Sequence, residues 1–370
     1  MPKVKFKRCI LHIGGEKTGS TSLQLALADV REELLEHGIY VPDRGVFRGN
    51  NWGFVAIAQH EPENSSFAAR LKEGQSHADG IAQLQREYEH DFVKKAKGCD
   101  QLLVSSEHLQ TQVNCQGIET LLAWIGGMAD ECLIVYAARR QDHALRSLYS
   151  TALRAAASTS FMFNPVNFQR AQSPRLNHWV AITRYLAYPA RVPVTVRVVP
   201  YPEGSLKREA FWRNLTTALN LPFNLTLANE ANTALGLAPS RFLTTLFHPS
   251  MHPHLRFERP ERLQLLAELG TLDGSGRVQP SKDWALDVLD GYKHSNRLLR
   301  ETFIRDESEV FNLNVNTYPE QSSGVIGMTQ KEFFDFLDAA PPVASVVSEV
   351  GEVPTSAGFY EAIRERTRLS

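Results

Sequence analysis

The residues with the clearest chemical potential are a lysine and a run of hydroxyl side chains that follow the first apolar segment. Residues 10–24 read ILHIGGEKTGSTSLQ, so an apolar segment enters two glycines and then reaches Lys17 and Gly19. A helical pattern follows and ends near Gly38. A small-residue turn at a helix start directs backbone N–H groups into one concavity, where the helix dipole adds partial positive charge. The stretch predicts a phosphate or sulfate site, with Lys17 supplying a full charge.

The spacing of this loop departs from the nucleotide-binding pattern GxxxxGK[ST]. Gly14 and Gly19 have the required separation, but Ser20 occupies the position of that motif's lysine. The lysine stands before Gly19 instead, so the loop can hold an anion without the magnesium arrangement of the motif. The alternative is a structural turn between a strand and a helix, in which the lysine is incidental.

The loop resembles the 5′-phosphosulfate-binding loop of the sulfotransferases that use PAPS (3′-phosphoadenosine 5′-phosphosulfate). In that family a lysine, a Ser or Thr, a glycine and further hydroxyl residues follow the first strand. The residues that match this order are Lys17, Thr18, Gly19, Ser20, Thr21 and Ser22. The resemblance implies that these residues hold the 5′-phosphate of PAPS and that Lys17 also takes part in catalysis.

A second phosphate-binding pattern follows the apolar segment 132–138, where Arg139 and Arg140 stand side by side. A planar guanidinium group suits a bidentate grip on phosphate. Ser147 follows Arg139 by eight positions, about two turns into the next helical pattern. The same family binds the 3′-phosphate of PAPS with an arginine and a serine at this spacing. The resemblance therefore implies that role for Arg139 and Ser147, with Arg140 as the other candidate for the arginine contact.

Glu107 and His108 follow another apolar segment, residues 101–106. Ligands of doubly wound sheets bind at the carboxyl ends of the strands, so both side chains are candidates for acid–base work. The resemblance implies that Glu107 is the catalytic base that takes the acceptor's proton, with His108 as the second candidate. A helix N-cap or a surface turn is the alternative interpretation of this pair.

The order of apolar segments and helical patterns predicts an α/β fold. The resemblance implies a three-layer, P-loop-like sulfotransferase fold, in which helices flank a central, mostly parallel sheet. The resemblance covers a PAPS-binding core at about 8–240, and we expect the sulfotransferase domain to span residues 1–315, with a helical remainder after the core and an irregular segment near 316–326 at its end. Residues 316–370 form a C-terminal extension that carries no chemical signal.

The composition excludes several classes of protein. The 370 residues include 40 basic and 41 acidic side chains, and a net charge of −1 argues against general nucleic-acid binding. Since no stretch reaches about 18 apolar residues, we expect no stable membrane insertion and a cytoplasmic location. The four cysteines form no CxxC pair, which indicates reduced thiols and no cysteine-based metal site.

Two segments without regular periodicity, residues 43–66 and 159–178, are rich in aromatic and amide side chains. Asn50, Asn51 and Trp52 in the first of them are candidates for an acceptor groove, although a surface loop with a buried tryptophan explains the same pattern. The segment Asn232–Leu235 resembles one in bacterial carbohydrate sulfotransferase homologues.

These patterns together predict an enzyme that transfers a sulfuryl group from PAPS to a hydroxyl or amine. The predicted acceptor is a carbohydrate or other small molecule, such as a saccharide or glycolipid. The product is PAP and no metal is needed. One alternative is a kinase with a degenerate Walker loop, which the lysine placement and the pair Arg139 and Ser147 count against. The other is a PAP- or nucleotide-binding protein without catalysis, which a turnover measurement would distinguish.

Overall fold

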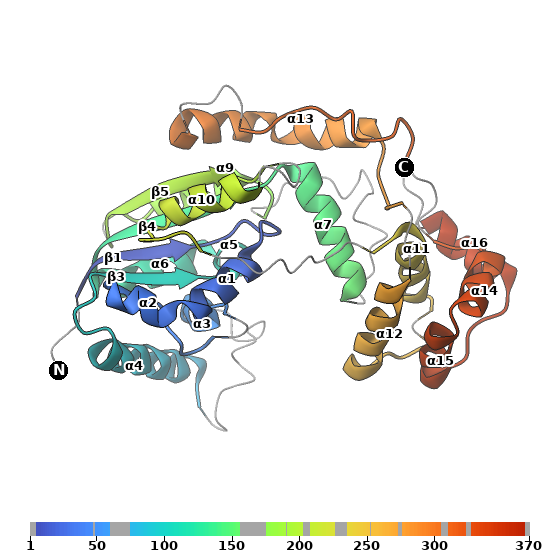
Figure 1. Cartoon of the computed structure of the whole chain (residues 1–370), viewed down its shortest axis with the longest axis horizontal. Coiled ribbons are helices and arrows are strands. Elements are labelled where there is room, and N and C mark those ends of the chain that lie inside the picture. The colour runs from blue at the N-terminus through green and yellow to red at the C-terminus, as the bar shows by residue number, and fades with distance from the viewer. Residues whose placement is uncertain are drawn as a thin grey trace. The chain divides into compact units, whose positions relative to one another are not determined.

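The computed structural model describes the chain in segments that form two compact units (Figure 1). The described residues are 5–46, 49–59, 75–155, 175–189, 191–202, 208–225, 235–251, 253–272, 276–304, 310–322 and 327–366. The first unit holds Met1–Arg140, Ser173–Glu230 and Lys293–Asn312, and the second holds Gln141–Gln172, Ala231–Tyr292 and Leu313–Ser370. The predicted limits of the sulfotransferase domain and of the C-terminal extension concern function and stay predictions.

The first unit is built around a five-stranded, all-parallel sheet with the strand order β2-β3-β1-β4-β5. Its strands are β1 (Phe6–His12), β2 (Ile39–Tyr40), β3 (Gln101–Ser105), β4 (Ala129–Ala138) and β5 (Val194–Pro200). The last residue of β1, His12, pairs with Ser105 on one side and Val135 on the other. The predicted α/β fold with a parallel sheet between helices is therefore confirmed.

Helices cover both faces of this sheet. They are α1 (Ser20–Asp29), α2 (Arg31–Glu36), α3 (Trp52–Ala58), α4 (His77–Lys95), α5 (His108–Thr111), α6 (Cys115–Gly126), α9 (His178–Leu186), α10 (Arg208–Ala218) and the π-helical turn η4 (Arg300–Ile304). One face buries Leu23, Leu34 and Phe211 from α1, α2 and α10. The other buries residues of α3, α4, α6 and α9, among them Phe54 and Ile118. From β1 to β2 the chain moves toward one edge of the sheet, and from β2 through β3 and β4 to β5 it moves toward the other edge. Because each crossover is right-handed, the helices that connect strands in these two directions lie on opposite faces.

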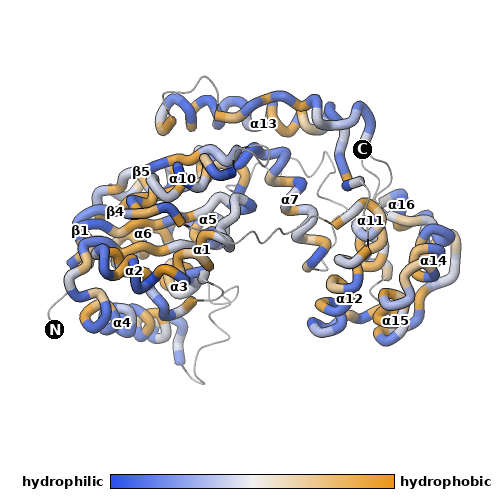
Figure 2. Tube along the Cα trace, in the orientation of Figure 1, coloured by the Kyte–Doolittle hydropathy of each residue, from blue (hydrophilic) through white to orange (hydrophobic). Residues whose placement is uncertain are grey.

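The prediction that residues 43–66 are irregular is wrong for α3, which lies inside them. Every residue from Gly53 to Ala58 is buried, so this helix has no polar face to reveal its period. By contrast, α4 carries both hydrophilic and hydrophobic positions in Figure 2, as expected of a helix with one face toward solvent. The helical pattern before Gly38 is divided at Val30, where α1 ends and α2 begins.

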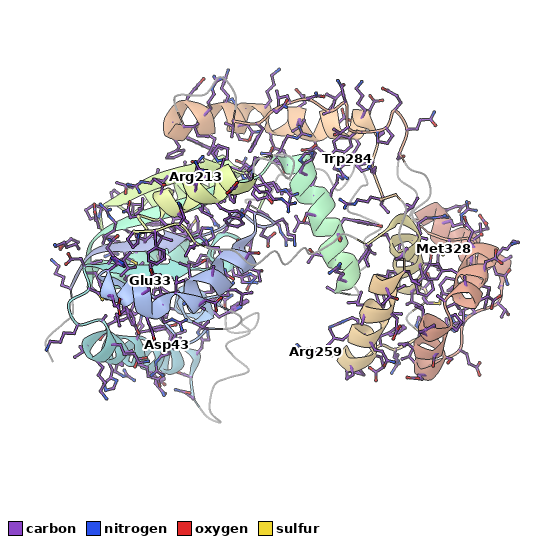
Figure 3. All side chains as sticks on the ribbon, viewed as in Figure 1. Glu33, Asp43, Arg213, Arg259, Trp284 and Met328 are labelled. Atoms are coloured by element: carbon purple, nitrogen blue, oxygen red, sulfur yellow. The ribbon has the colours of Figure 1, made fainter. Side chains whose placement is uncertain are left out.

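The second unit is helical in its described residues. Its helices are α7 (Gln141–Arg154), α11 (Leu237–Leu246), α12 (Arg259–Thr271), the first part of α13 (Lys282–Leu299), α14 (Gln330–Ala339), α15 (Pro341–Val350) and α16 (Ala357–Arg366). The Phe242 ring of α11 stacks on Phe333 and Phe336 of α14. Met328, labelled in Figure 3, is buried, and its backbone N–H donates to the Thr245 hydroxyl (2.8 Å). Aromatic packing between neighbouring helices thus supplies much of this core.

The start of α7 is held within the second unit by a buried carboxylate. Tyr318 donates its hydroxyl proton to Asp142 Oδ2 (2.7 Å), and the Arg146 guanidinium lies 5.1 Å from the centre of the Tyr318 ring. Farther along the helix, the hydroxyl groups of Tyr149 and Thr244 form a hydrogen bond of 2.9 Å. These contacts fix the helix that carries Ser147.

We expect the protein to lose stability in mild acid, because two of its histidines are buried in the folded state. Burial lowers the pKa of both His12 and His178 to about 4, against an ordinary value of about 6.5 in the unfolded chain. Between these two pKa values, both histidines are protonated in the unfolded chain but remain neutral in the folded chain. Stability is therefore full above pH 6.5 and falls as the pH drops toward 4, by up to about 1.4 kcal/mol per pH unit and per histidine. Urea unfolding midpoints at pH 7.5, 5.5 and 4.5 measure this loss, and equal midpoints would contradict it.

Candidate active site

The loop after β1 lies at the centre of the sheet edge, between the ends of β3 and β4. The Ser106 N–H donates to the carbonyl oxygen of His12 (2.9 Å), which ties the end of β3 to β1. On the other side, the Gly15 N–H donates to the carbonyl oxygen of Ala137 (2.9 Å). Residues that follow β1, β3 and β4 therefore meet at one edge, where ligands of doubly wound sheets bind.

The loop owes its course to residues with positive φ angles. Gly14 (φ 99°), Lys17 (φ 64°) and Gly19 (φ 87°) are all in the left-handed region. Lysine rarely adopts this conformation, and such residues concentrate at functional sites. The Thr18 hydroxyl donates to the Gly15 carbonyl oxygen (2.6 Å), so this side chain stabilises the loop from inside. The result is a compact turn that delivers Lys17 to the start of α1.

The start of α1 has the features of an anion-binding site. Its N-cap, Gly19, offers no side-chain acceptor to the first N–H groups, and the first turn contains no acidic residue. The Ser20 hydroxyl is buried and has no hydrogen-bond partner among the described residues. Thr21 is exposed, and Ser22 is partly buried. The open N–H groups, the Ser20 hydroxyl and Lys17 form a donor set that fits a phosphate group.

Gly19 also leaves room for an aromatic side chain, which leads to a testable prediction. A Cβ atom at Gly19 would lie 2.7 Å from Trp212 of α10, whereas one at Gly98 would meet nothing within 4 Å. Both glycines have nearly the same φ, 87° and 86°. Gly98→Ala should therefore lower the free energy of unfolding only by the conformational cost of alanine at positive φ, about 1 kcal/mol. We expect Gly19→Ala to lower the free energy of unfolding further and also to weaken PAP binding. Thermal unfolding and PAP titration of both variants measure the difference, and equal effects would contradict it.

Of the two candidate arginines, Arg139 is the one that lies at the loop. Its guanidinium donates to the carbonyl oxygen of Lys17 (2.5 Å) and lies 5.1 Å from the centre of the Tyr201 ring. Arg140 is 1% exposed and donates to the backbone carbonyl of Asn312 (2.5 Å). Arg140 is therefore a buried structural residue, and Arg139 is the arginine whose guanidinium lies against the loop.

A buried histidine supports the position of Arg139. His178 donates from Nε2 to the carbonyl oxygen of Arg139 (2.8 Å) and accepts at Nδ1 from the Tyr136 hydroxyl (2.8 Å). This pattern uses one donor and one acceptor of a neutral imidazole, which agrees with its lowered pKa. Ser147, the predicted partner of Arg139, lies in α7 of the second unit, and the pairing of the two residues stays a prediction.

Glu107 lies two residues after the end of β3 and against the loop. A Cβ atom at Gly14 would lie 3.0 Å from the Glu107 Cβ, so the two backbones approach closely here. Glu107 Oε2 accepts from the side-chain amides of Gln24 (2.7 Å) and Asn50 (2.9 Å). Glu107 occupies the N-cap position of α5, but its carboxylate makes no capping hydrogen bond. Both amide donors bind the same carboxylate oxygen, so the other oxygen, Oε1, is the one left for a reacting group.

His108 lies on the Oε1 side of Glu107. Its Nε2 is 3.7 Å from Glu107 Oε1, its ring stacks on Trp52 at 4.3 Å between ring centres, and its Nδ1 is 3.1 Å from Gln112 Nε2. Asn51 has a structural role instead, since its Oδ1 accepts from the Ser105 N–H (2.8 Å). Asn50 and Trp52, both candidates from the sequence, therefore support Glu107 and His108.

Several residues of the site were absent from the sequence-based prediction. Gln24 lies on the buried face of α1 among apolar residues. A polar residue at such a position is the one feature of the sequence that could have identified it. Trp212, which lies against Gly19, carried no signal in the sequence. Residues 156–174 and 226–234 lie outside the described residues, and with them most of the predicted acceptor wall at 159–178 and most of Asn232–Leu235.

The described part of the chain also bears on metal binding, on the state of the cysteines and on membrane-spanning helices. It contains no group of three or more His, Cys, Asp or Glu side chains that could hold a metal ion. The cysteines are free thiols, as their scattered positions predicted: Cys9, Cys99, Cys115 and Cys132. Among the described helices, none has the length and hydrophobicity needed to cross a membrane.

Comparisons with known proteins yield structural neighbours only. No protein family and no curated protein matches the sequence. The crystal structure of a sulfotransferase from Alicyclobacillus acidocaldarius is similar over 81% of this chain and 96% of its own, with a TM-score of 0.39 and 12% identity. The sulfotransferase domain from the curacin biosynthetic pathway is similar over 60% of this chain and 76% of its own, with a TM-score of 0.31 and 16% identity.

Proposed function

We propose that this protein is a PAPS-dependent sulfotransferase that acts on a hydroxyl or amine of a carbohydrate or other small-molecule acceptor. One observation carries the proposal: the three central strands bring the Lys17 loop, Glu107 and Arg139 to a single edge of the sheet. An anion-binding loop, a carboxylate and a guanidinium group are the parts that sulfuryl transfer from PAPS requires. The proposal includes a saccharide or glycolipid acceptor, a cytoplasmic location, PAP as the product and no metal.

The chemistry divides between these residues as follows. An acceptor oxygen attacks the sulfur of PAPS, a new S–O bond forms, and the S–O bond to the 5′-phosphate breaks with its electron pair leaving on PAP. Glu107 takes the proton of the acceptor. Lys17 and the N–H groups at the start of α1 stabilise the negative charge that grows on the leaving phosphate. Positioning and charge stabilisation supply most of the rate, as in phosphoryl transfer.

Arg139 and Ser147 would hold the 3′-phosphate, which PAPS has and ATP lacks. The hydrogen bond from Arg139 to the Lys17 carbonyl couples the two phosphate sites, because the same guanidinium stabilises the loop that binds the 5′-phosphate. This coupling favours PAPS over the kinase alternative, whose nucleotide would leave Arg139 without a phosphate partner. The non-catalytic alternative differs in lacking turnover.

Calorimetric titration with PAP and, separately, with ATP and Mg²⁺ tests the cofactor. We expect PAP to bind without metal and Arg139→Ala to weaken it by about 10- to 100-fold, since a hydrogen bond to a charged group contributes about 1.5–3 kcal/mol. Arg191→Ala is the matched control, because Arg191 is an exposed partner of Glu119 in the same unit. Metal-dependent binding of ATP, with no binding of PAP, would reject the proposal in favour of the kinase.

A further inference from the structure

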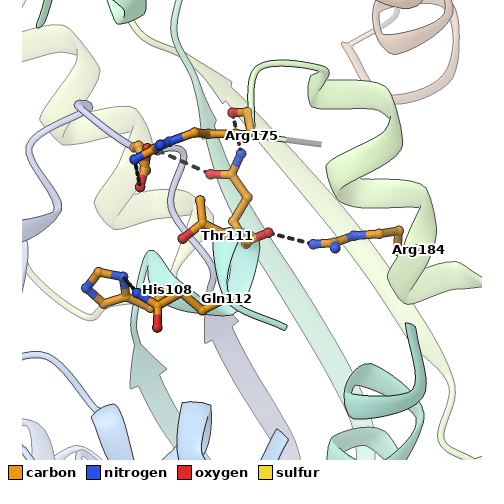
Figure 4. A pocket seen from close by; sticks show the side chains of 7 residues that line it. His108, Thr111, Gln112, Arg175 and Arg184 are labelled. Carbon is orange, nitrogen blue, oxygen red and sulfur yellow. Dashed lines mark hydrogen bonds and ion pairs between the residues drawn. The ribbon is translucent and has the colours of Figure 1, made fainter. Parts of the chain in front are cut away.

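A cavity of about 480 Å³ lies beside α5 in the first unit (Figure 4). Its lining includes His108, Thr111, Gln112, Arg175 and Arg184, and every lining side chain is polar. The volume falls within the range of small-molecule sites. Hydroxyl groups of a ligand would find hydrogen-bond partners on such walls, whereas a phenyl ring would leave the polar groups unsatisfied.

The cavity lies next to both reactive groups of the proposed site. Glu16, which lines it, directly precedes Lys17 in the loop. His108, another lining residue, is the neighbour of Glu107 Oε1 (3.7 Å). Since Gln24 and Asn50 bind Oε2, the carboxylate oxygen that remains for a substrate is Oε1, the one next to the lining residue His108.

The cavity carries one positive charge that no lining carboxylate balances. Arg175 forms a bidentate ion pair with Glu16, with Nη2 3.0 Å from one of the carboxylate oxygens, so these two charges cancel. Arg184 donates instead to the backbone carbonyl oxygens of Val113 (2.9 Å) and Gln110 (2.7 Å), and a dashed line at Arg184 in Figure 4 marks one hydrogen bond of its guanidinium. Among the described residues, no carboxylate forms an ion pair with Arg184. A partly buried guanidinium in this setting favours an anionic ligand.

On the basis of the proposed function, we propose that this cavity is the acceptor subsite and that it takes a saccharide bearing an acidic group. Arg184 balances the charge of that group, and Thr111 of α5 and Gln112 after it bind the ring hydroxyls. One hydroxyl of the same saccharide then reaches Glu107 Oε1, which takes its proton while the oxygen accepts the sulfuryl group.

Methyl β-glucuronide and methyl β-glucoside are the probes, because they differ only in a carboxylate against a hydroxymethyl group. Transfer of ³⁵S from labelled PAPS is measured for both at low salt, with 2-naphthol as the third acceptor. We expect kcat/KM for the glucuronide to exceed the other two values by about tenfold or more, since a charged hydrogen bond contributes that much. The preference should fall to near parity in Arg184→Gln, persist in Arg184→Lys, and be unchanged in the control Arg191→Gln.

A space-filling variant tests the location independently of the charge. Thr111 lines the cavity and is partly buried, whereas Thr217 is exposed on α10. Thr111→Phe should raise KM for the glucuronide about tenfold or more and leave PAP binding unchanged, and Thr217→Phe should alter neither. Thermal unfolding of each variant shows whether it is folded.

The outcomes separate this inference from the proposed function. If PAP binds but 2-naphthol or the glucoside is the better acceptor, or no saccharide is sulfated, the inference is overturned and the cofactor assignment stands. The same holds if the preference survives in folded Arg184→Gln or if KM is unchanged in folded Thr111→Phe. If PAP does not bind to the unaltered protein, the proposed function fails and the inference fails with it.

Discussion

Replacing Lys17 with alanine is expected to lower kcat for sulfuryl transfer by about 10²- to 10³-fold, the effect of removing one preorganised donor from a developing negative charge. Alanine keeps the Cβ atom, so the cost of the positive φ at Lys17 is unchanged and the loop keeps its course. The hydrogen bond from Arg139 to the Lys17 carbonyl involves only the backbone of residue 17 and is also retained. The loss therefore reports on the ammonium group alone.

The matched control for this variant is Lys7→Ala. Lys7 is an exposed lysine of β1 that pairs with Asp100 (2.7 Å), and it precedes the strand end where the loop begins. We expect its removal to leave kcat within a factor of two. A Lys17→Ala enzyme that kept a third or more of its kcat would show that Lys17 does not act on the leaving phosphate.

The second large effect is expected for Glu107→Gln, which should lower kcat by about 10²- to 10⁴-fold because the acceptor then loses its general base. Glutamine has the same shape, and its carbonyl oxygen can accept from Gln24 and Asn50 as Oε2 does now. PAP binding should therefore be unchanged, so that the loss appears in kcat. Single-turnover transfer and PAP titration of the same preparation measure the two quantities.

Two comparisons make the role of Glu107 specific. Glu131→Gln is the control, since Glu131 lies near the start of β4, pairs with Arg8 and should have no effect on kcat. His108→Gln should lower kcat by less than tenfold, because His108 contacts Glu107 from the side and is the second candidate for the base. A larger loss for His108→Gln than for Glu107→Gln would assign the base to His108.

The parts of the site that the sequence predicted are those that follow directly from a strand. Where an apolar segment gives way to polar residues, the sequence indicates the carboxyl end of a strand. This pattern alone singled out Lys17, Glu107 and Arg139 as candidates. Parallel strands place their carboxyl ends at one edge, which is why the three residues meet. The same reasoning predicted the sheet and most of its helices.

The parts that escaped prediction depend on contacts between distant segments. Gln24 and Asn50 reach Glu107 across 83 and 57 positions of sequence, and no local pattern shows that two amides converge on one carboxylate oxygen. The choice between Arg139 and Arg140 likewise needed the contact of Arg140 with Asn312, at a separation of 172. The wrong prediction that residues 43–66 are irregular has a different cause. The helix α3 within them is almost wholly buried, so it lacks a polar face and gives no periodic signal.

The most direct test of the account is transfer of ³⁵S from labelled PAPS to an acceptor, followed in the unaltered protein and in Glu107→Gln. The acceptors are methyl β-glucuronide, methyl β-glucoside and 2-naphthol, and PAP binding is titrated on the same samples. We expect label in an acceptor for the unaltered protein, a loss of about 10²-fold or more in the variant, and equal PAP affinity in both. PAP binding without label in any of the three acceptors would contradict this result and favour the alternative of a nucleotide-binding protein without catalysis.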